Sequence, residues 1–167
     1  MAEVARIETT AFSPVRDKPL LAIGAGGLIA GTLDLTYAIA VYSPHRPILV
    51  PQTIASGVLG MKAYEGGMQT AILGVFLHFV IALGAATVFY VASRQIAFMT
   101  EHAVVSGLIF GALVYAFMHV IVLPLSEAPH GHSHLFTKVC EFVWHWFGVG
   151  LPIAISVRRY ACIRGLR

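Results

Sequence analysis

The sequence has little charge and almost no cysteine for its length. Only 11% of its 167 residues are charged, whereas 57% are hydrophobic, and soluble domains carry about 25% charged residues. Its two cysteines, Cys140 and Cys162, fall near opposite ends of one predicted helix, about 33 Å apart at 1.5 Å per residue. A disulfide framework is therefore excluded, and a soluble globular domain is disfavoured.

The sequence also lacks the motifs that carry familiar catalytic chemistry. It contains no glycine-rich phosphate loop, no serine in a nucleophile elbow and no His-Glu-x-x-His zinc motif. Glu141 and His145 are four residues apart and share a helix face, where they can hydrogen-bond to each other. No third metal ligand accompanies them, so we expect a protein that is not an enzyme.

Four long apolar runs occupy most of the chain. The runs are continuous rather than alternating, which favours helices over membrane strands, and each can cross about 30 Å of hydrocarbon. The predicted fold class is an all-α integral membrane protein, a four-transmembrane-helix bundle. Its spans are expected at residues 20–42, 68–92, 102–125 and 135–157, forming a membrane domain (20–157) between cytoplasmic tails at 1–19 and 158–167.

A shorter apolar segment lies between the first two predicted spans, at residues 51–65. Pro51 suits the first turn of a helix, and Gly66 with Gly67 ends it. About 15 helical residues cover only about 22 Å, which is too short to span a bilayer comfortably. We therefore predict an interfacial or re-entrant helix.

Positive charges favour one orientation in the membrane. With both termini in the cytoplasm, eight lysines and arginines fall on the cytoplasmic side and three, Arg46, Lys62 and Lys138, on the external side. The basic residues sit at span ends rather than on an aromatic-studded face, so we expect the lipid bilayer as partner and no nucleic acid. The predicted interfaces carry tyrosines, as membrane interfaces commonly do: Tyr42, Tyr64 and Tyr160.

Two of the predicted spans contain Gly-x-x-x-Gly, as Gly27 with Gly31 and Gly107 with Gly111. Small residues at this spacing let helix backbones approach closely. The motif predicts helix packing, either within the bundle or in a homodimer or larger membrane complex.

Each long apolar run contains ionisable side chains, which are costly inside a membrane unless they have a partner or a purpose. They are Asp34, His78, His119, Glu141 and His145. Counted from the external end of each span, the estimated depths are about 12 Å for Asp34, about 15 Å for His78 and His145, and about 9 Å for His119 and Glu141. The sequence therefore predicts a polar layer in the outer half of the membrane.

A histidine-rich loop follows the third predicted span, with His130, His132 and His134 at alternate positions. Imidazole binds zinc, copper and nickel, so the loop predicts a weak site for a divalent metal ion. Imidazole also changes its charge between pH 5 and pH 8, so the same residues suit an external pH sensor. A plain solvated loop is the alternative.

Several short segments resemble small four-span bacterial inner-membrane proteins of the YagU-like group, over about residues 20–160. The matching segments are 26–34, 54–60, 74–79, 118–120, 123–126 and 141–147. The resemblance implies a bacterial inner-membrane location and a four-span fold, and it brings no substrate or activity. The loop histidines 130, 132 and 134 lie outside the shared segments.

The polar layer supports three hypotheses about function. The first is handling of protons or a cation, or a response to pH, by these acids and imidazoles. The second is a structural or assembly subunit whose polar side chains only pack helices. The third and least favoured is a haem-binding electron carrier, with His78 and His145 as axial ligands. The sequence establishes no cofactor.

Overall fold

The computed structural model describes residues 17–129 and 134–161, and every regular element in these two ranges is helical. Residues 1–16 and 162–167, which make up most of the predicted tails (1–19 and 158–167) and include Cys162, lie outside the described residues, as do the loop histidines His130 and His132. In chain order the elements are α1 (Pro19–Tyr42), α2 (Leu49–Leu59), the 3₁₀ helix η1 (Gly60–Tyr64), α3 (Gly67–Ser93), α4 (Phe98–Glu101), α5 (Ala103–Phe117), the π-helix η2 (Met118–Val122), α6 (Leu123–Leu125), α7 (Leu135–Trp144), the π-helix η3 (His145–Gly150) and α8 (Leu151–Tyr160).

Four stretches are helical, long enough and apolar enough to cross a membrane: Pro19–Tyr42, Gly67–Ser93, Ala103–Leu125 and Leu135–Tyr160. Their ends lie within three residues of the predicted spans. The prediction of an all-α chain with four helices of membrane-crossing length is therefore confirmed for the described residues.

The distribution of side chains is the inverse of that in a soluble domain. Large apolar residues such as Leu20, Phe76 and Val120 are exposed, whereas the buried core consists mainly of alanine with Phe89 and Ile153. Helices in lipid have no hydrophobic driving force to hide leucine, and small residues let their backbones approach. This pattern suits a multi-pass membrane protein.

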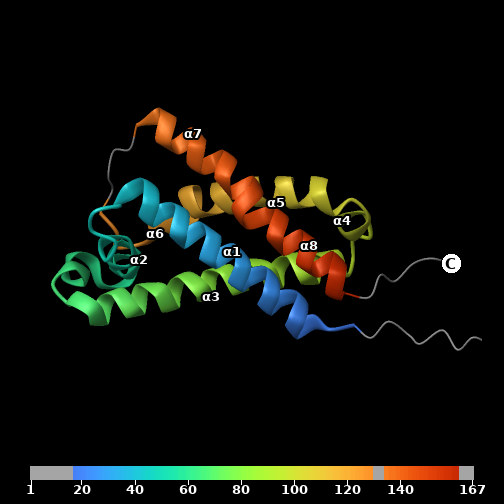
Figure 1. Cartoon of the computed structure of the whole chain (residues 1–167), viewed down its shortest axis with the longest axis horizontal. Helices are drawn as coiled ribbons and strands as arrows, with labels where there is room; N and C mark the ends of the chain where they lie inside the picture. Colours follow the sequence, from blue (N-terminus) through green and yellow to red (C-terminus); the bar gives the residue numbers. More distant parts are fainter. Residues whose placement is uncertain (1–16, 130–133, 162–167) are drawn as a thin grey trace, which may run out of the picture.

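The long helices run between two ends of the bundle (Figure 1). At one end, here called the α4 end, α1 begins beside the end of α8, and Lys18 N donates a hydrogen bond to the Tyr160 carbonyl over 3.0 Å. Arg94, after α3, forms an ion pair with Asp17 at 3.3 Å. The opposite, α2 end holds the end of α1, all of α2, the beginning of α3 and α6 (Figure 1).

The segment predicted as one helix over 51–65 is two elements instead. Gly60 has φ +57, a left-handed conformation that favours glycine and ends α2 there. The chain continues as the 3₁₀ helix η1. The α2 helix packs closely on α3, because the Pro51 backbone carbonyl touches α3 where Gly74 has no side chain.

The predicted packing glycines lie at crossings within this chain. A Cβ atom on Gly27 would come within 3.0 Å of Leu83 Cα, and one on Gly31 within 2.9 Å of the Phe79 ring, both on α3. Gly107 and Gly111 of α5 lie in the same way against η3 and α8. The structure thus uses both Gly-x-x-x-Gly motifs for packing inside the bundle.

Candidate functional site

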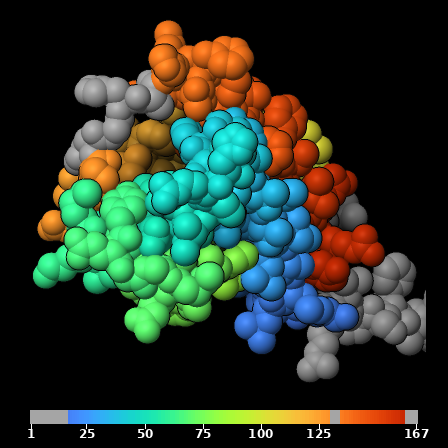
Figure 2. Space-filling model, turned by 60° about the vertical axis from the view of Figure 1, so that its left-hand side comes forward, coloured from blue at the N-terminus to red at the C-terminus, as the bar shows by residue number. Residues whose placement is uncertain are grey.

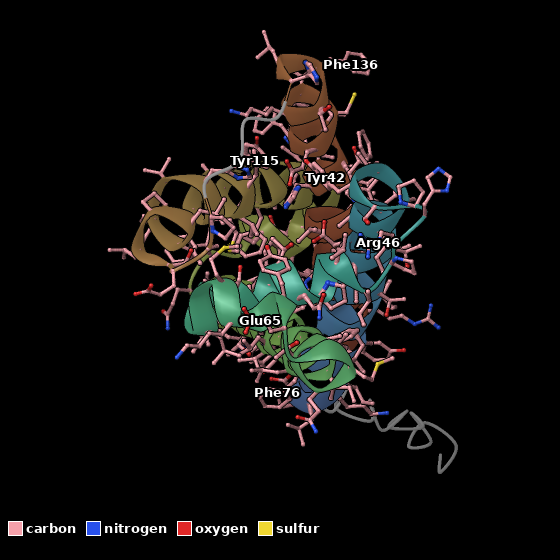
Figure 3. All side chains as sticks on the ribbon, turned by 90° about the vertical axis from the view of Figure 1, so that its left-hand side faces the viewer. Tyr42, Arg46, Glu65, Phe76, Tyr115 and Phe136 are labelled. Carbon is pink, nitrogen blue, oxygen red and sulfur yellow. The ribbon has the colours of Figure 1, made fainter. Side chains whose placement is uncertain are left out.

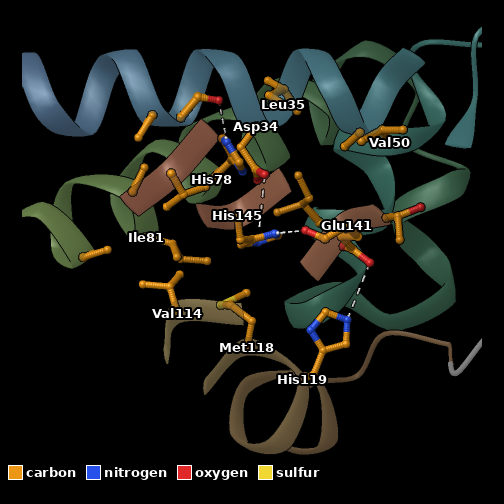
Figure 4. Close-up of a pocket in the computed structure, with 18 of the residues that line it drawn as sticks. Asp34, Leu35, Val50, His78, Ile81, Val114, Met118, His119, Glu141 and His145 are labelled. Atoms are coloured by element: carbon orange, nitrogen blue, oxygen red, sulfur yellow. Dashed lines mark hydrogen bonds and ion pairs between the residues drawn. The ribbon is translucent and has the colours of Figure 1, made fainter. Parts of the chain in front are cut away.

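The five side chains of the predicted polar layer line a single cavity of about 390 Å³ at the α2 end. They come from five different elements: Asp34 from α1, His78 from α3, His119 from η2, Glu141 from α7 and His145 from η3. The close-up in Figure 4 shows their side chains directed toward one another. We call this cavity the polar pocket. Figure 2 shows this side of the molecule, with the cyan end of α1 and the orange α7 at the surface.

Two histidine–carboxylate pairs cross the polar pocket. His145 Nε2 lies 3.9 Å from Asp34 Oδ1, and His119 Nε2 lies 3.8 Å from Glu141 Oε2 (Figure 4). The first pair joins η3 to α1, and the second joins η2 to α7. The His145 side chain is only 9% exposed, whereas that of His119 is 30% exposed, so the pocket has an inner and an outer pair.

The other ring nitrogen of each histidine is held by its own helix. His145 Nδ1 lies 2.8 Å from the Glu141 carbonyl oxygen, and His119 Nδ1 lies 3.0 Å from the Tyr115 carbonyl oxygen. A carbonyl oxygen only accepts hydrogen bonds, so Nδ1 carries a proton in both rings. This geometry directs both Nε2 atoms toward carboxylates on neighbouring helices.

The predicted hydrogen bond between the Glu141 and His145 side chains is replaced by this arrangement. His145 bonds to the Glu141 backbone, and the Glu141 carboxylate turns to His119 and to Tyr42, whose hydroxyl donates to Oε2 over 2.8 Å. Tyr42 therefore belongs to the site. Sequence reasoning placed Tyr42 only as an interfacial aromatic, because its partner is 99 residues away along the chain.

Both histidines of these pairs lie in π-helical turns. His119 is in η2 and His145 begins η3, and each turn ends two residues before a proline, Pro124 or Pro152. Proline has no N–H and its ring clashes with the carbonyl four residues earlier, so the preceding turn widens. Such wide turns occur frequently at functional sites. The repeated Leu-Pro dipeptides were the sequence signal for them, which the prediction of spans at 102–125 and 135–157 did not use.

Aromatic rings surround the two pairs. The Tyr115 ring stacks on His119 with centroids 3.9 Å apart and meets His145 edge-on at 5.2 Å. Trp144 stacks on Tyr37 of α1 at 4.6 Å. In Figure 3, Tyr42 and Tyr115 lie toward the middle of the α2 end, whereas Phe76 and Phe136 point outward.

His78 has a simpler role than the other two histidines. Its Nε2 lies 2.8 Å from the Gly31 carbonyl oxygen, across the contact between α3 and α1. The absence of a side chain at Gly31 permits this approach, since the Phe79 ring and Ala82 already fill the space there. His78 therefore lines the polar pocket and also links α3 to α1 by a hydrogen bond.

The positions of the histidine and acidic side chains do not favour the metal or the haem hypothesis. Within residues 17–129 and 134–161, no three histidine, cysteine, aspartate or glutamate side chains are placed to hold a metal ion. Of the loop histidines only His134 is described; it directly precedes α7. The Nε2 atoms of His78 and His145, which would bind a haem iron, face the Gly31 carbonyl and the Asp34 carboxylate instead.

Comparisons with known proteins add no further assignment. No protein-family model, curated protein or solved structure matches this chain. The resemblance to the YagU-like group therefore stays a prediction from the short segments quoted above.

Proposed function

We propose that this chain is a multi-pass bacterial inner-membrane protein whose polar pocket binds and releases protons, so that it handles protons or responds to external pH. The observation that carries the proposal is the hydrogen-bond inventory of His119 and His145. In each ring Nδ1 faces a backbone carbonyl and Nε2 faces a carboxylate. Both partners are acceptors, and a neutral imidazole has only one N–H to donate.

Each ring therefore gains a second favourable contact when it takes up a proton. A separation of 3.8–3.9 Å is too long for a direct hydrogen bond but within the range of an ion pair. Imidazole changes charge between pH 5 and pH 8, which makes protonation accessible under ordinary conditions. Asp34 and Glu141 are the acidic groups that face the two Nε2 atoms.

The location of the pocket supports exchange of protons with the external side. The positive charges favour cytoplasmic termini, and the described ends of the chain meet at the α4 end. The polar pocket lies at the opposite, α2 end. In this orientation it occupies the outer half of the membrane, with the half-exposed His119–Glu141 pair outermost.

The two tryptophans of the chain provide a direct test, because Trp144 and Trp146 flank His145. We expect their fluorescence in the purified protein to change between pH 5 and pH 8. In the His119→Gln and Glu141→Gln variants the change is lost or displaced by about a pH unit or more. His102→Gln is the matched control, since His102 stacks on Phe98 at the α4 end. An unchanged titration in both pocket variants contradicts the proposal.

Proton flux in proteoliposomes separates the two forms of the proposal. Protein-dependent flux that disappears in His119→Gln supports proton handling. A pH-dependent fluorescence change without flux supports a pH-responsive protein.

A structural or assembly subunit is the second candidate. The His78–Gly31 hydrogen bond favours it, because that contact joins two helices and needs no titration. This candidate predicts tryptophan fluorescence that is flat over the same pH range and co-purification with a larger complex. A haem carrier has least support, and purified protein without Soret absorbance after growth with haem supply excludes it.

A further inference from the structure

We propose that the polar pocket also binds a monovalent lipophilic organic cation, which competes with protons for Asp34 and Glu141. This inference rests on the proton-binding role proposed above and adds a ligand class to it. Three observations support it: the polar pocket is lined by two carboxylates, its remaining lining is mainly apolar, and a second apolar hollow adjoins it.

The charged lining of the polar pocket favours a cation. Asp34 and Glu141 are its carboxylates, and among the described residues no lysine or arginine lines it. Carboxylates in a membrane need a positive partner. The imidazoles are such partners only while they are protonated, so at high pH the pocket carries two acidic groups without a permanent counter-charge. A bound organic cation supplies it.

The remaining lining determines the kind of cation. A metal ion needs several ligands around one point, and no such group occurs among the described residues. The cavity of about 390 Å³ is within the usual range for small-molecule sites and is otherwise lined mainly by apolar side chains, such as Ile54, Ile81 and Leu123. An ion with a single charge and a large apolar body matches this combination.

A second hollow adjoins the polar pocket and shares lining residues with it. It lies between α3 and α5 and measures about 610 Å³, and all described residues that line it are apolar, for example Val88, Phe110 and Phe117. Four residues line both cavities: Ile81, Ala85, Val114 and Met118. Lipophilic ions concentrate in the bilayer, so this hollow is a direct route of entry.

Met118 stands at the boundary between the two cavities and begins the π-turn η2. Its unbranched side chain has several rotatable bonds and adapts to neighbouring shapes. A stiffer ring at this position narrows the passage. Met118 is therefore the residue expected to set which ions enter.

Competition with protons follows from the groups that face the cavity. The titratable side chains around it are Asp34, Tyr37 and Tyr42 of α1, His78 of α3, Tyr115 of α5, His119 of η2, Cys140 and Glu141 of α7, and His145 of η3. The lining residues from α2 are Val50, Thr53 and Ile54, which do not titrate in this range. Protonating the imidazoles or the carboxylates makes the pocket less negative. Cation affinity therefore rises with pH, by up to about tenfold per pH unit for each proton displaced.

The test is equilibrium binding of tetraphenylphosphonium to the purified full chain in detergent at pH 5.5, 7.0 and 8.5. We expect the affinity to rise with pH and to fall about tenfold or more in Asp34→Asn and in Glu141→Gln. Glu101→Gln is the control, because Glu101 lies at the α4 end. Met118→Phe is expected to slow the association of tetraphenylphosphonium, because the stiffer ring narrows the entry. Triphenylphosphine oxide, which is neutral, is expected not to compete.

Tetraphenylphosphonium binding that changes neither with pH nor in the two carboxylate variants overturns the inference, because it indicates that the ion partitions onto apolar surface. Equal binding of the neutral oxide overturns it as well. Absence of tetraphenylphosphonium binding with the tryptophan titration intact overturns the ligand assignment alone. Absence of both removes the proton-binding role too. Each variant is first shown to elute as wild type in size-exclusion chromatography, and Asp34→Glu with Glu141→Asp, which keep the charge, are expected to retain pH-dependent binding.

Discussion

The two ends of the bundle are built in different ways. At the α4 end, α1, α3, α5 and α8 meet through small residues, and buried Ala22, Ala86 and Ala154 pack with Phe89 and Ile153. Ser156 Oγ there donates to the Ala22 carbonyl over 3.0 Å in a fully buried bond. At the α2 end, two helices widen into π-turns, and the space between them is a cavity lined by acids and imidazoles.

The contrast between the two ends shows how one helix bundle can hold both a closely packed core and a polar cavity. Close backbone contacts at the α4 end fix the four helices, and the polar side chains buried there are hydroxyls such as Ser93, Ser106 and Ser156. The proline-associated π-turns at the α2 end contain His119 and His145 of the polar pocket, and a widened turn moves side chains out of the regular helical register. Substitutions at the helix contacts and in the polar pocket test this difference. We expect the largest loss of stability at the glycine contacts.

Gly111→Ala is expected to cost the most stability. The new Cβ would overlap the His145 backbone carbonyl, which cannot move independently of η3. Overpacking against backbone predicts a loss of about 2–3 kcal/mol in the free energy of unfolding. Gly84→Ala is the control, since nothing lies within 4 Å of the added methyl group. Equal stability of the two variants in denaturant titrations would sink this account of the α5–η3 contact.

Tyr42→Phe is expected to have an intermediate effect at the α2 end. It removes a hydroxyl that donates to the Glu141 carboxylate over 2.8 Å, for an expected loss of about 1 kcal/mol. Tyr64→Phe is the matched control, because its hydroxyl donates to the neutral Thr53 hydroxyl over 3.1 Å. Bonds to charged groups are stronger, so thermal unfolding should show the larger loss for Tyr42→Phe. The reverse order contradicts the Tyr42–Glu141 bond as the stronger of the two.

A double-mutant cycle on Asp34 and His145 is expected to give a smaller energy. Asp34→Asn, His145→Gln and the double variant should show a coupling of about 0.5–1 kcal/mol. The ion pair exists only while the imidazole is protonated, so the coupling should be present at pH 6 and decline as the pH rises to 8.5. Chemical unfolding at the two pH values measures it. Coupling that is independent of pH assigns the pair to neutral packing.

Substitution of Pro152 is expected to change stability least. It tests whether the π-turn η3 is needed for the pH response of the polar pocket. Pro152→Ala restores an N–H donor and lets η3 return toward α-helical geometry, which moves His145 relative to Asp34. The free energy of unfolding should change by less than about 1 kcal/mol, whereas the pH-dependent tryptophan fluorescence should be lost or displaced. Pro19→Ala, in the first turn of α1, should leave that titration as in wild type. An unaltered titration in Pro152→Ala would show that the π-turn is dispensable.

Much of the fold could be predicted because the bilayer constrains it. An apolar run of given length fixes a spanning helix, and a rise of 1.5 Å per residue fixes the approximate depth of each side chain. Those two facts placed Asp34, His78 and His145 in one layer, and the structure brings them to one cavity. The same reasoning treated the segment 51–65 as one helix, since the break depends on a left-handed Gly60.

The partners within the pocket could not be predicted. Local spacing suggested that Glu141 bonds to the His145 side chain, but the structure pairs Glu141 with His119 and Tyr42. Each choice depends on how helices rotate about their axes and on where a helix widens. Those variables are decided by contacts among distant segments, such as Gly111 against η3.

The sequence by itself determined four helices of membrane-crossing length, their approximate ends and the position of each ionisable residue along its helix, because helix rise is a local, additive quantity. Only the tertiary structure decided which acid meets which imidazole, and that both rings face acceptors on both sides. Which acid meets which imidazole depends on how the helices rotate about their axes and how closely they approach each other. The sequence of one helix does not determine either quantity.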